Sequence, residues 1–522
     1  MAHLSIYASH DSSVCIKTGP NAYRVYEMER ILGKRFVAIN KDPDFEKHMR
    51  FIKELIAKDY PNLQTWGSCY NAQCTDENKE VLQKVFGFEH FETMEHHIGH
   101  AGGALWQSPF EKCLIISSDG GGWDNDGQTS FKVFLGDKKT QKVTQVAQLP
   151  VDACGAYTLL AIPIQEIYKT DTLSRYLTYA GKLMGLAAYG SPRAEWIKPM
   201  EAYFYGGDDM ESLDKQKVLG EQVGLPLGEI NTISGQTAYD FAATAQHVFE
   251  TISMLTMRPF IERYKMPICL TGGGALNVLL NKKIQDTYPQ YPLFVPCNPN
   301  DSGLAFGYIA LRNPPDKGDV IRVTYDGVGI LDKEKLPEYV SKYKAQLCHY
   351  KQLARVLNNG RTIGVMIGNS ETGPRALGHR SILCLPSEGM KEKLNSKIKF
   401  REEFRPYAPV CRTEDVSTYF EYSGESEFMS YAVKVREEFR DKIPAVVHKD
   451  GTARVQTVTQ EQNPFLHNLL FAIDVLTGTG VLLNTSLNIK GKPMCTTVAE
   501  AISIWQETEL DGVYIEGYLF MK

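Results

Sequence analysis

Several features that mark other classes of protein are missing from this sequence. The eleven cysteines are scattered, and no two of them form a Cys-x-x-Cys pair. Their number and spacing argue against a disulfide framework and against a zinc site made of cysteines. No apolar run approaches the roughly 18 residues that a membrane span needs, and the first residues do not resemble a signal peptide. The sequence therefore predicts a cytoplasmic protein with buried free thiols and no membrane partner.

An excess of basic charge, internal repeats and a Walker A motif are also missing. The net charge is −5, so a nucleic-acid polymer is not an expected partner. The segment Gly373–Arg380 has the glycine spacing of a Walker A motif but lacks its Lys-Ser/Thr ending. What is present is a chain of 522 residues, 43% apolar and 23% charged. These values predict a globular protein of two or three domains, with the oligomeric state open and a homodimer among the options.

Short apolar segments that end in glycine or acidic turns recur through the first 335 or so residues. Residues 4–16 read as two strands around a small turn that carries His10. Residues 113–116 read as a strand ending at Asp119 before three glycines, and residues 268–270 as a strand leading into Gly272–Gly274. This alternation of strand, turn and helix predicts an α/β domain whose polar groups gather at strand ends, where such folds bind ligands.

His96 and His100 are four residues apart. On a helix their side chains would leave the same face, with Cβ atoms about 5–6 Å apart, which suits two ligands of one metal ion. Asp119 is a candidate third ligand, and Asp301 is either a ligand or a helix cap. Histidines at this spacing are more often ordinary surface or core residues, so the spacing alone does not establish a metal. Calcium is less favoured because the acids of residues 119–126 do not match an EF-hand.

A second unit is expected from about residue 339, and it is rich in cations. Two arginines lie in the segment Gly373–Ser381, and four more cations precede Pro406: Lys397, Lys399, Arg401 and Arg405. Arginine forks match phosphate oxygens, so this density favours an anion pocket. The alternative, a charged surface helix over residues 391–401, accounts for its lysines but not for Arg375 or Arg405. Lys182, in a small-residue helix, either meets a phosphate or extends along the surface.

Taken together and in order, a series of motifs resembles the O-carbamoyltransferases of antibiotic tailoring and nodulation-factor decoration. The motifs are His-Asp-Ser-Ser at 10–13, His-His-x-x-His-Ala at 96–101, Gly-Lys-Leu-Met-Gly-Leu-Ala-Ala-Tyr-Gly at 181–190, Gly-Gly-Gly-Ala-Leu-Asn at 272–277, Asp-Ser-Gly at 301–303, Gly-Pro-Arg-Ala-Leu-Gly-x-Arg-Ser-Ile at 373–382, Phe-Arg-Pro-Tyr-Ala-Pro at 404–409, His-x-Asp-Gly-Thr-Ala-Arg-x-Gln at 448–456 and Asn-Thr-Ser-x-Asn at 484–488. The resemblance extends over almost the whole chain.

This resemblance implies an α/β fold of two domains. Residues 1–338 would form an actin/sugar-kinase-like domain, similar to threonylcarbamoyl-transfer proteins, and residues 339–522 a domain similar to threonylcarbamoyl-adenylate synthases. The resemblance also implies that ATP, with its Mg²⁺, and carbamoyl phosphate are co-substrates. The second domain would make carbamoyl adenylate, and the first would transfer the carbamoyl group to a hydroxyl of a small-molecule alcohol.

The resemblance further implies the residues of each site. The metal ligands would be His96, His100, Asp119 and Asp301, with Fe²⁺ favoured and Mn²⁺, Zn²⁺ or Mg²⁺ as alternatives. The carbamoyl phosphate ligands would be Lys399, Arg405, Arg454, Asn484 and Ser486, to which we add Arg375 from the same cation-rich region. The expected nucleotide contacts are Gly272, Gly273, Gly274, Asn277 and Lys182. His10 is the candidate base for the alcohol, His97 is expected to be structural, and residues 194–236, which match the family poorly, are expected to contact the acceptor.

Other functions fit parts of the pattern. The same chemistry could act on a hydroxymethylated nucleotide or nucleobase, or the chain could be a non-catalytic nucleotide-binding regulatory module. Intact ligand candidates at all four metal positions argue against the regulatory module. The acidic net charge argues against threonylcarbamoyl transfer to tRNA, and the missing Cys-x-x-Cys pairs argue against a hydrogenase-maturation enzyme.

Overall fold

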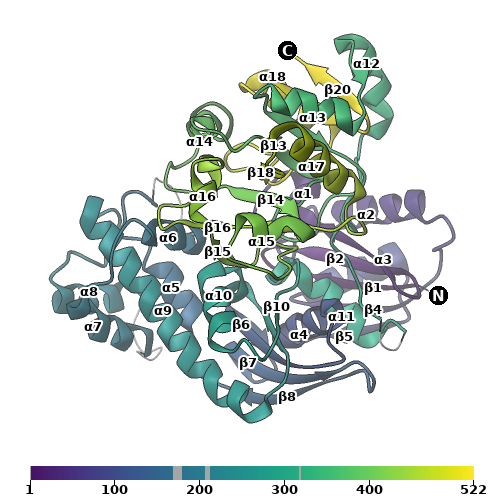
Figure 1. The fold of residues 1–522 in the computed structure, drawn as a ribbon. Helices are drawn as coiled ribbons and strands as arrows, with labels where there is room; N and C mark the ends of the chain where they lie inside the picture. The colour runs from purple at the N-terminus through teal and green to yellow at the C-terminus, as the bar shows by residue number, and fades with distance from the viewer. Residues whose placement is uncertain (1, 169–178, 206–211, 317–318) are drawn as a thin grey trace.

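The computed structural model describes residues 2–168, 179–205, 212–316 and 319–522 (Figure 1). The chain begins with a five-stranded sheet of order β3-β2-β1-β4-β5. Its strands are β1 (Ala2–Tyr7), β2 (Ser13–Gly19), β3 (Ala22–Glu27), β4 (Trp66–Ala72) and β5 (His90–Thr93). Helices α2 (Phe45–Asp59) and α3 (Asp76–Phe86) pack on this sheet, and α1 (Met28–Leu32) follows β3. In α2 the residues Phe45, Met49, Ile52 and Ile56 are buried, at the spacing that places them on one face of the helix.

A second five-stranded sheet repeats the connectivity of the first. Its strands are β6 (Lys112–Asp124), β7 (Gly127–Asp137), β8 (Lys142–Gln148), β9 (Ile268–Thr271) and β10 (Leu293–Phe294), in the order β10-β9-β6-β7-β8. In both sheets the first three strands pair antiparallel, and the last two join parallel on the other side of the first. The sequence search for repeats missed this duplication because strand order does not require similar residues. The duplicated α/β arrangement confirms the fold class predicted for this part.

Two helices join the sheets, because each packs on the sheet to which it does not belong by sequence. Helix α4 (His96–Gln107) follows the first sheet in sequence but packs on β6 and β9 of the second, whereas α11 (Leu304–Arg312) follows the second sheet and packs on β1 and β2 of the first. The helices also pack on each other (Figure 1). Their backbones come close because glycines line the contact: a Cβ on Gly307 would overlap the carbonyl oxygen of Gly99.

We expect Gly307→Ala to destabilise the protein by about 3 kcal/mol, because the added methyl group must push the two helices apart. Gly103→Ala is the matched control: on the same contact, the nearest atoms to its Cβ would lie 3.8 Å away. Alanine favours a helix over glycine by about 1 kcal/mol, so this control should be neutral or stabilising. Urea unfolding of the two variants measures the difference, and an equal loss of stability in both would contradict the close backbone contact.

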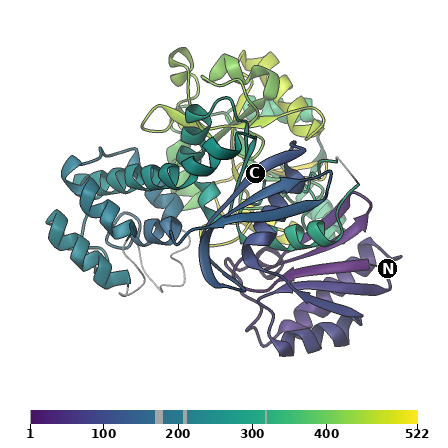
Figure 2. The same cartoon turned by 90° about the horizontal axis from the view of Figure 1, so that it is seen from below.

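Other helices cover the outer side of the second sheet. They are α5 (Ala153–Leu159), α6 (Tyr179–Ala187), α7 (Ala194–Tyr205), α8 (Ser212–Val223) and α9 (Gly235–Tyr264), and α10 (Val278–Thr287) follows β9. Figures 1 and 2 place α7, α8 and α9 at the side of the molecule away from the first sheet. Residues 194–236, expected to contact the acceptor, form α7, α8 and the approach to α9, while 206–211 lie outside the described residues. Within the described part, no helix is both long and apolar enough to cross a membrane.

The remainder of the chain is built on an eight-stranded sheet of order β11-β20-β19-β12-β13-β18-β14-β17. Its strands are β11 (Gln346–Leu347), β12 (Ile363–Met366), β13 (Arg380–Cys384), β14 (Ala408–Arg412), β17 (Gln456–Val458), β18 (Val481–Ser486), β19 (Gly512–Ile515) and β20 (Tyr518–Met521), with β15 (Ala432–Lys434) and β16 (Thr452–Arg454) as a separate pair. Its helices are α12 (Leu336–Tyr343), α13 (Tyr350–Asn358), α14 (Met390–Lys393), α15 (Val416–Tyr419), α16 (Glu437–Arg440), α17 (Pro464–Thr477) and α18 (Val498–Glu507). The expected boundary between residues 338 and 339 falls inside α12, which packs on β20; the division into domains stays a prediction.

One expectation about local structure is wrong, and the alternative weighed for residues 391–401 is met only in part. The strand expected to end at Asp119 continues to Asp124, with a bulge between Ser118 and Gly122, and the turn follows at residues 125–126. The glycines allow the bulge, and Gly121 adopts a φ of 132° that other residues rarely reach. The helix considered over residues 391–401 is also interrupted. Helix α14 passes into a π-helical turn, Leu394–Lys399, which ends at Phe400 in the left-handed conformation.

Candidate metal centre and cation cluster

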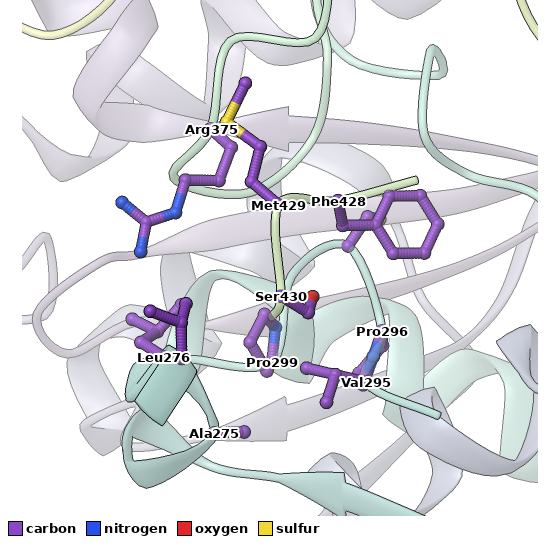
Figure 3. A pocket seen from close by; sticks show the side chains of 11 residues that line it. Ala275, Leu276, Val295, Pro296, Pro299, Arg375, Phe428, Met429 and Ser430 are labelled. Atoms are coloured by element: carbon purple, nitrogen blue, oxygen red, sulfur yellow. The ribbon is translucent and has the colours of Figure 1, made fainter. Parts of the chain in front are cut away.

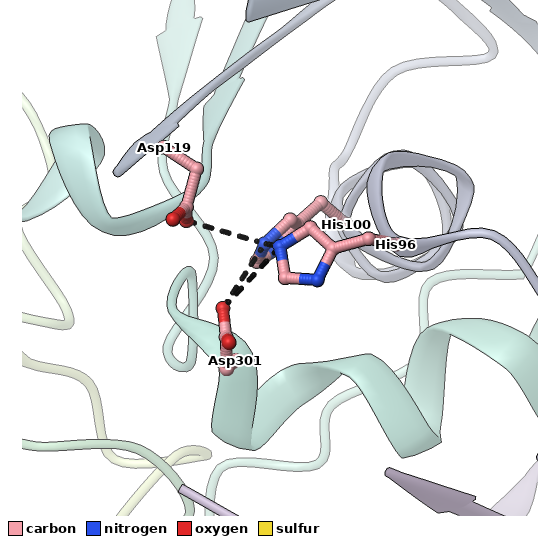
Figure 4. A group of neighbouring side chains, drawn as sticks. All are labelled: His96, His100, Asp119 and Asp301. Atoms are coloured by element: carbon pink, nitrogen blue, oxygen red, sulfur yellow. Dashed lines mark hydrogen bonds and ion pairs between the residues drawn. The ribbon is translucent and has the colours of Figure 1, made fainter. Parts of the chain in front are cut away.

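The four predicted metal ligands meet in the interior of the N-terminal part. His96 and His100 lie one turn apart on α4, Asp119 comes from the bulge of β6, and Asp301 stands just before α11 (Figure 4). One candidate ligand atom from each of the four lies within 4.8 Å of the others. The two histidine Nε2 atoms are 3.1 Å apart, and Nε2 of His100 is 3.3 Å from Oδ2 of Asp119 and 3.4 Å from Oδ1 of Asp301. All four residues are buried.

The charges of this group fit a divalent cation. Burial by itself would raise the pKa of Asp119, but His100 and the backbone N–H of Gly273 outweigh it and hold that pKa below its usual range. Burial is likewise outweighed for Asp301, whose pKa is lowered by His96 and His10. Two ionised carboxylates therefore face two imidazoles inside the protein. Mixed nitrogen and oxygen donors suit Fe²⁺, Mn²⁺ or Zn²⁺ better than Mg²⁺, which prefers oxygen.

Neighbouring groups hold the carboxylates in place. The hydroxyl of Tyr7 donates to Oδ2 of Asp301 at 2.7 Å, and the backbone N–H groups of Gly120 and Gly273 each donate to Asp119 at 2.6 Å. Such outer contacts orient metal ligands. The sequence analysis missed Tyr7, which is separated from Asp301 by 294 positions. Its place in an apolar strand gives no signal of this role. Gly122 is needed for a different reason, because a Cβ there would overlap the His96 ring.

The structure brings His10 next to this group. It lies in the turn between β1 and β2, where Asp11 adopts a left-handed φ of 56°. Nε2 of His10 is 3.5 Å from Oδ2 of Asp301, and Nδ1 is 3.7 Å from Oδ2 of Asp11. Burial opposes protonation, but Asp301 and Asp11 outweigh it and raise the pKa of His10 to about 9. His10 therefore carries a proton at neutral pH unless a cation at Asp301 offsets that carboxylate.

His97 differs from its neighbours on α4. Its Nδ1 is 2.7 Å from the hydroxyl of Ser117, and its Nε2 is 2.9 Å from the carbonyl oxygen of Thr129, so both ring nitrogens are engaged. Burial lowers the pKa of His97 to about 4. These contacts tie α4 to β6 and β7 and agree with the structural role expected for this residue.

The residues expected to contact a nucleotide do not all lie together. Gly272–Gly274 and Asn277 lie between β9 and α10, but the N–H of Gly273 already binds Asp119, and Oδ1 of Asn277 caps α10 by accepting from Leu280. Lys182 instead lies 3.1 Å from Oε1 of Glu402 in the C-terminal part. A small pocket joins the glycine turn to Arg375 (Figure 3). It is lined by Ala275, Leu276, Val278, Val295, Pro296, Cys297, Pro299, Arg375, Phe428, Met429 and Ser430.

The residues expected to bind carbamoyl phosphate lie on neighbouring elements of the C-terminal part. We call Arg375, Lys399, Arg401, Arg405 and Arg454 the cation cluster. Neither Arg375 nor Arg454 has a side-chain hydrogen bond or ion pair to a described residue, and Nε of Arg454 is a buried donor without a partner. Burial and repulsion by Arg375, Arg401 and Arg405 place the pKa of Arg454 well below its ordinary value. Burial likewise lowers the pKa values of Arg375 and Arg405 to about 10, with repulsion by Arg401 adding to the effect at Arg405.

Some polar groups beside the cation cluster already have hydrogen-bond partners, and others do not. Nζ of Lys399 donates to the carbonyl oxygens of Ser486 and Asn488 at 2.7 and 2.8 Å. Nδ2 of Asn484 donates to Ala376 and Gln456, while its buried Oδ1 has no partner. Burial and repulsion by Arg401 and Arg405 lower the pKa of Lys399.

Arg401 and Glu402 belong to the same region but were not predicted from the sequence as site residues. Arg401 was within the basic run, but its stacking on Tyr407 at 4.0 Å is a structural observation. Glu402 lies between Lys182 and Arg405, 3.1 Å from the first and 3.8 Å from the second. It therefore connects α6 to the cation cluster, and no local sequence pattern indicates a contact between residues so far apart.

Comparison with known proteins identifies the family. The sequence profile for the carbamoyltransferase N-terminus matches residues 34–310, and the profile for the carbamoyltransferase C-terminus matches residues 354–522. Nodulation protein NolO of Bradyrhizobium diazoefficiens is 30% identical over 82% of this chain and 79% of its own length. Nodulation protein U of Rhizobium tropici is 30% identical over 66% of this chain and 62% of its own, and protein sll1178 of Synechocystis, whose function is uncharacterized, is 29% identical over 82% and 76%.

Among solved structures the likeness is weaker. The HypF structure of T. kodakarensis has a TM-score of 0.34 and 16% identity, and the match covers 61% of this chain and 49% of that one. The N-terminal profile alone matches more than half of the chain and includes the four residues of the metal group, while the C-terminal profile includes the whole cation cluster. These matches confirm the resemblance found in the sequence: the chain belongs to the carbamoyltransferase family and is a carbamoyltransferase.

Proposed function

We propose that this carbamoyltransferase is an ATP-dependent O-carbamoyltransferase that makes carbamoyl adenylate at the cation cluster and transfers its carbamoyl group to an alcohol at the metal group. The observation that carries the proposal is the pair Arg375 and Arg454, which have no acceptor among the described residues. Repelling guanidinium groups without partners favour an anionic ligand. Relatives named nodulation proteins support a small-molecule acceptor.

Carbamoyl phosphate suits the cation cluster. It is a small dianion, and Arg375, Arg405 and Arg454 offer its phosphate planar forks of donors. The buried Oδ1 of Asn484 has no partner and would accept from the carbamoyl NH₂, a contact that inorganic phosphate cannot make. Formation of carbamoyl adenylate releases pyrophosphate from ATP and inorganic phosphate from carbamoyl phosphate, and one water is consumed. Both products should therefore appear in equal amounts.

The metal group suits the second step. A divalent cation held by His96, His100, Asp119 and Asp301 would supply a Lewis acid that offsets negative charge on the adenylate phosphate. Tyr7 and the N–H of Gly273 fix the two carboxylates. His10, 38% exposed at its side chain and 3.5 Å from Asp301, would take the proton of the attacking hydroxyl once a cation at Asp301 lets it lose its own proton. AMP then leaves, and the carbamate ester stays on the acceptor.

The proposal is tested with purified protein and Mg²⁺. We expect pyrophosphate to appear only when ATP and carbamoyl phosphate are both present, and to exchange with ATP. Alcohols are then screened with labelled carbamoyl phosphate, with sugars in one set and hydroxymethylated nucleosides and nucleotides in another. If no pyrophosphate appears with both co-substrates at any metal tested, the adenylate step is contradicted. Pyrophosphate release without labelling of any alcohol in the two sets would count against these acceptor classes.

A further inference from the structure

Phe400 has an unusual position beside the cation cluster. Its side chain is 49% exposed, and its backbone adopts a left-handed φ of 49° at the end of the π-helical turn Leu394–Lys399. A bulky residue in this conformation costs about 1 kcal/mol, which asparagine or glycine largely avoids. Asparagine or glycine at this position would avoid both the strained backbone and the exposed ring.

The backbone on both sides of Phe400 is fixed. Lys399 before it is buried, and its Nζ is held by Ser486 and Asn488. Arg401 after it stacks on Tyr407 and donates to Oδ1 of Asn395 at 3.1 Å. The ring thus projects from a rigid support that also carries two members of the cation cluster.

Other exposed large apolar side chains of the C-terminal part lie elsewhere. Leu347 and Met521 are on β11 and β20, and Phe471, Val475 and Leu476 are on α17. The ring of Phe471 is covered by the guanidinium of Arg412 at 5.2 Å. Over residues 339–522, all of which are described, Phe400 is therefore the exposed aromatic residue without a ring or cation partner.

We propose that the Phe400 ring is the surface on which the adenine of ATP stacks during carbamoyl adenylate formation. This inference rests on the proposed function, which requires the ATP phosphates at the cation cluster. Phe400 is bonded directly to Lys399 and Arg401, two members of the cation cluster, so a base linked to phosphates held there would meet a ring that starts one residue from the cluster. In the glycine turn the N–H of Gly273 is bonded to Asp119, and residues 272–277 carry no aromatic ring on which a base could stack.

The test compares Phe400→Asn with Phe400→Trp, using Phe471→Asn on α17 as the matched control. Removing the ring should raise the KM for ATP about 10-fold in pyrophosphate exchange, since stacking on an aromatic ring strengthens the binding of a base by roughly this factor. The KM for carbamoyl phosphate should not change. Phe400→Trp and the control should behave as the unsubstituted protein does. Asparagine tolerates the left-handed backbone, so Phe400→Asn should fold at least as well.

Inorganic tripolyphosphate separates contacts to the base from contacts to the phosphates. It carries the charge of ATP without the base, so it should inhibit the unsubstituted protein and Phe400→Asn equally. An unchanged KM for ATP in Phe400→Asn overturns the inference. If the unsubstituted protein shows no pyrophosphate exchange, the proposed adenylate step is wrong. The role of the ring is then measured by titration calorimetry with ATP. Weaker ATP binding by Phe400→Asn supports stacking, and equal binding refutes it.

Discussion

Replacing His96 with alanine is expected to lower carbamoyl transfer to the acceptor by about 10³-fold, while carbamoyl-phosphate-dependent exchange of pyrophosphate into ATP stays within about twofold of normal. The reason is the separation of the two groups: His96 lies on α4, whereas the cation cluster lies in the C-terminal part, on the π-helical turn Leu394–Lys399, on β16 and on loops. Losing one of four ligands opens the metal group without touching Arg375 or Arg454. Transfer and exchange are measured on the same preparation with separate labels.

The control for His96→Ala is His90→Ala, which removes an exposed histidine from β5 and should change neither activity. Metal content per chain, measured by elemental analysis after loading with Fe²⁺, Mn²⁺ or Zn²⁺, should fall in His96→Ala alone. If the bound metal disappears and transfer remains complete, the metal has no part in the reaction. If exchange disappears together with transfer, the two steps do not belong to separate groups of residues.

Replacing Arg454 with methionine is expected to abolish pyrophosphate exchange and, with it, all transfer, while raising the free energy of unfolding by about 1 kcal/mol. The guanidinium of Arg454 is surrounded by cations and has a buried N–H without a partner, so its burial lowers the stability of the free protein. Methionine fills a similar volume without charge. Gains of this size are common where a site is kept for function at a cost to stability.

Arg355→Met is the control for Arg454→Met, because Arg355 is exposed on α13 and lies apart from the cation cluster. It should alter neither exchange nor unfolding. Normal exchange in Arg454→Met would remove Arg454 from the first step. If Arg454→Met is less stable than the unsubstituted protein, the charge of Arg454 is balanced by other groups in the free protein. Urea unfolding with and without carbamoyl phosphate provides a second test. The ligand should stabilise the unsubstituted protein and Arg355→Met, but not Arg454→Met.

The metal group was partly predictable because two of its members share one helix. The spacing of His96 and His100 places both on one face of α4, as expected from the sequence. Asp119 was a candidate from its place at a strand end, and Asp301 was either a ligand or a helix cap. The family resemblance joined them to the histidines, since nothing local reports that β6 and the start of α11 meet. The bulge that presents Asp119 depends on pairing with β7, so the sequence reading ended that strand too early.

Other features could not be predicted from the sequence because they depend on contacts between distant segments. Lys182 was a plausible phosphate ligand by its setting, but its partner is Glu402, which lies 220 positions away. Tyr7 looks like an ordinary core residue until Asp301 is placed beside it. The duplicated sheets show no repeat of residues because hydrophobic alternation and turn geometry specify strand order, and many sequences satisfy them. Lys399, Arg401 and Arg405 were noticed because their density is local, whereas Arg454 entered only through the family resemblance.

The exchange of α4 and α11 between the two sheets has a mechanical consequence. Each half of the N-terminal part holds a helix that belongs, by sequence, to the other, and the glycine contact around Gly99 and Gly307 locks the pair. A hinge between the halves would have to shear that contact and separate the histidines from Asp301. The two halves are therefore fixed relative to each other at the metal group, whose geometry should stay the same during substrate binding and product release. Helices α7 and α8 lie outside this contact, so substitutions on them should leave the metal group intact.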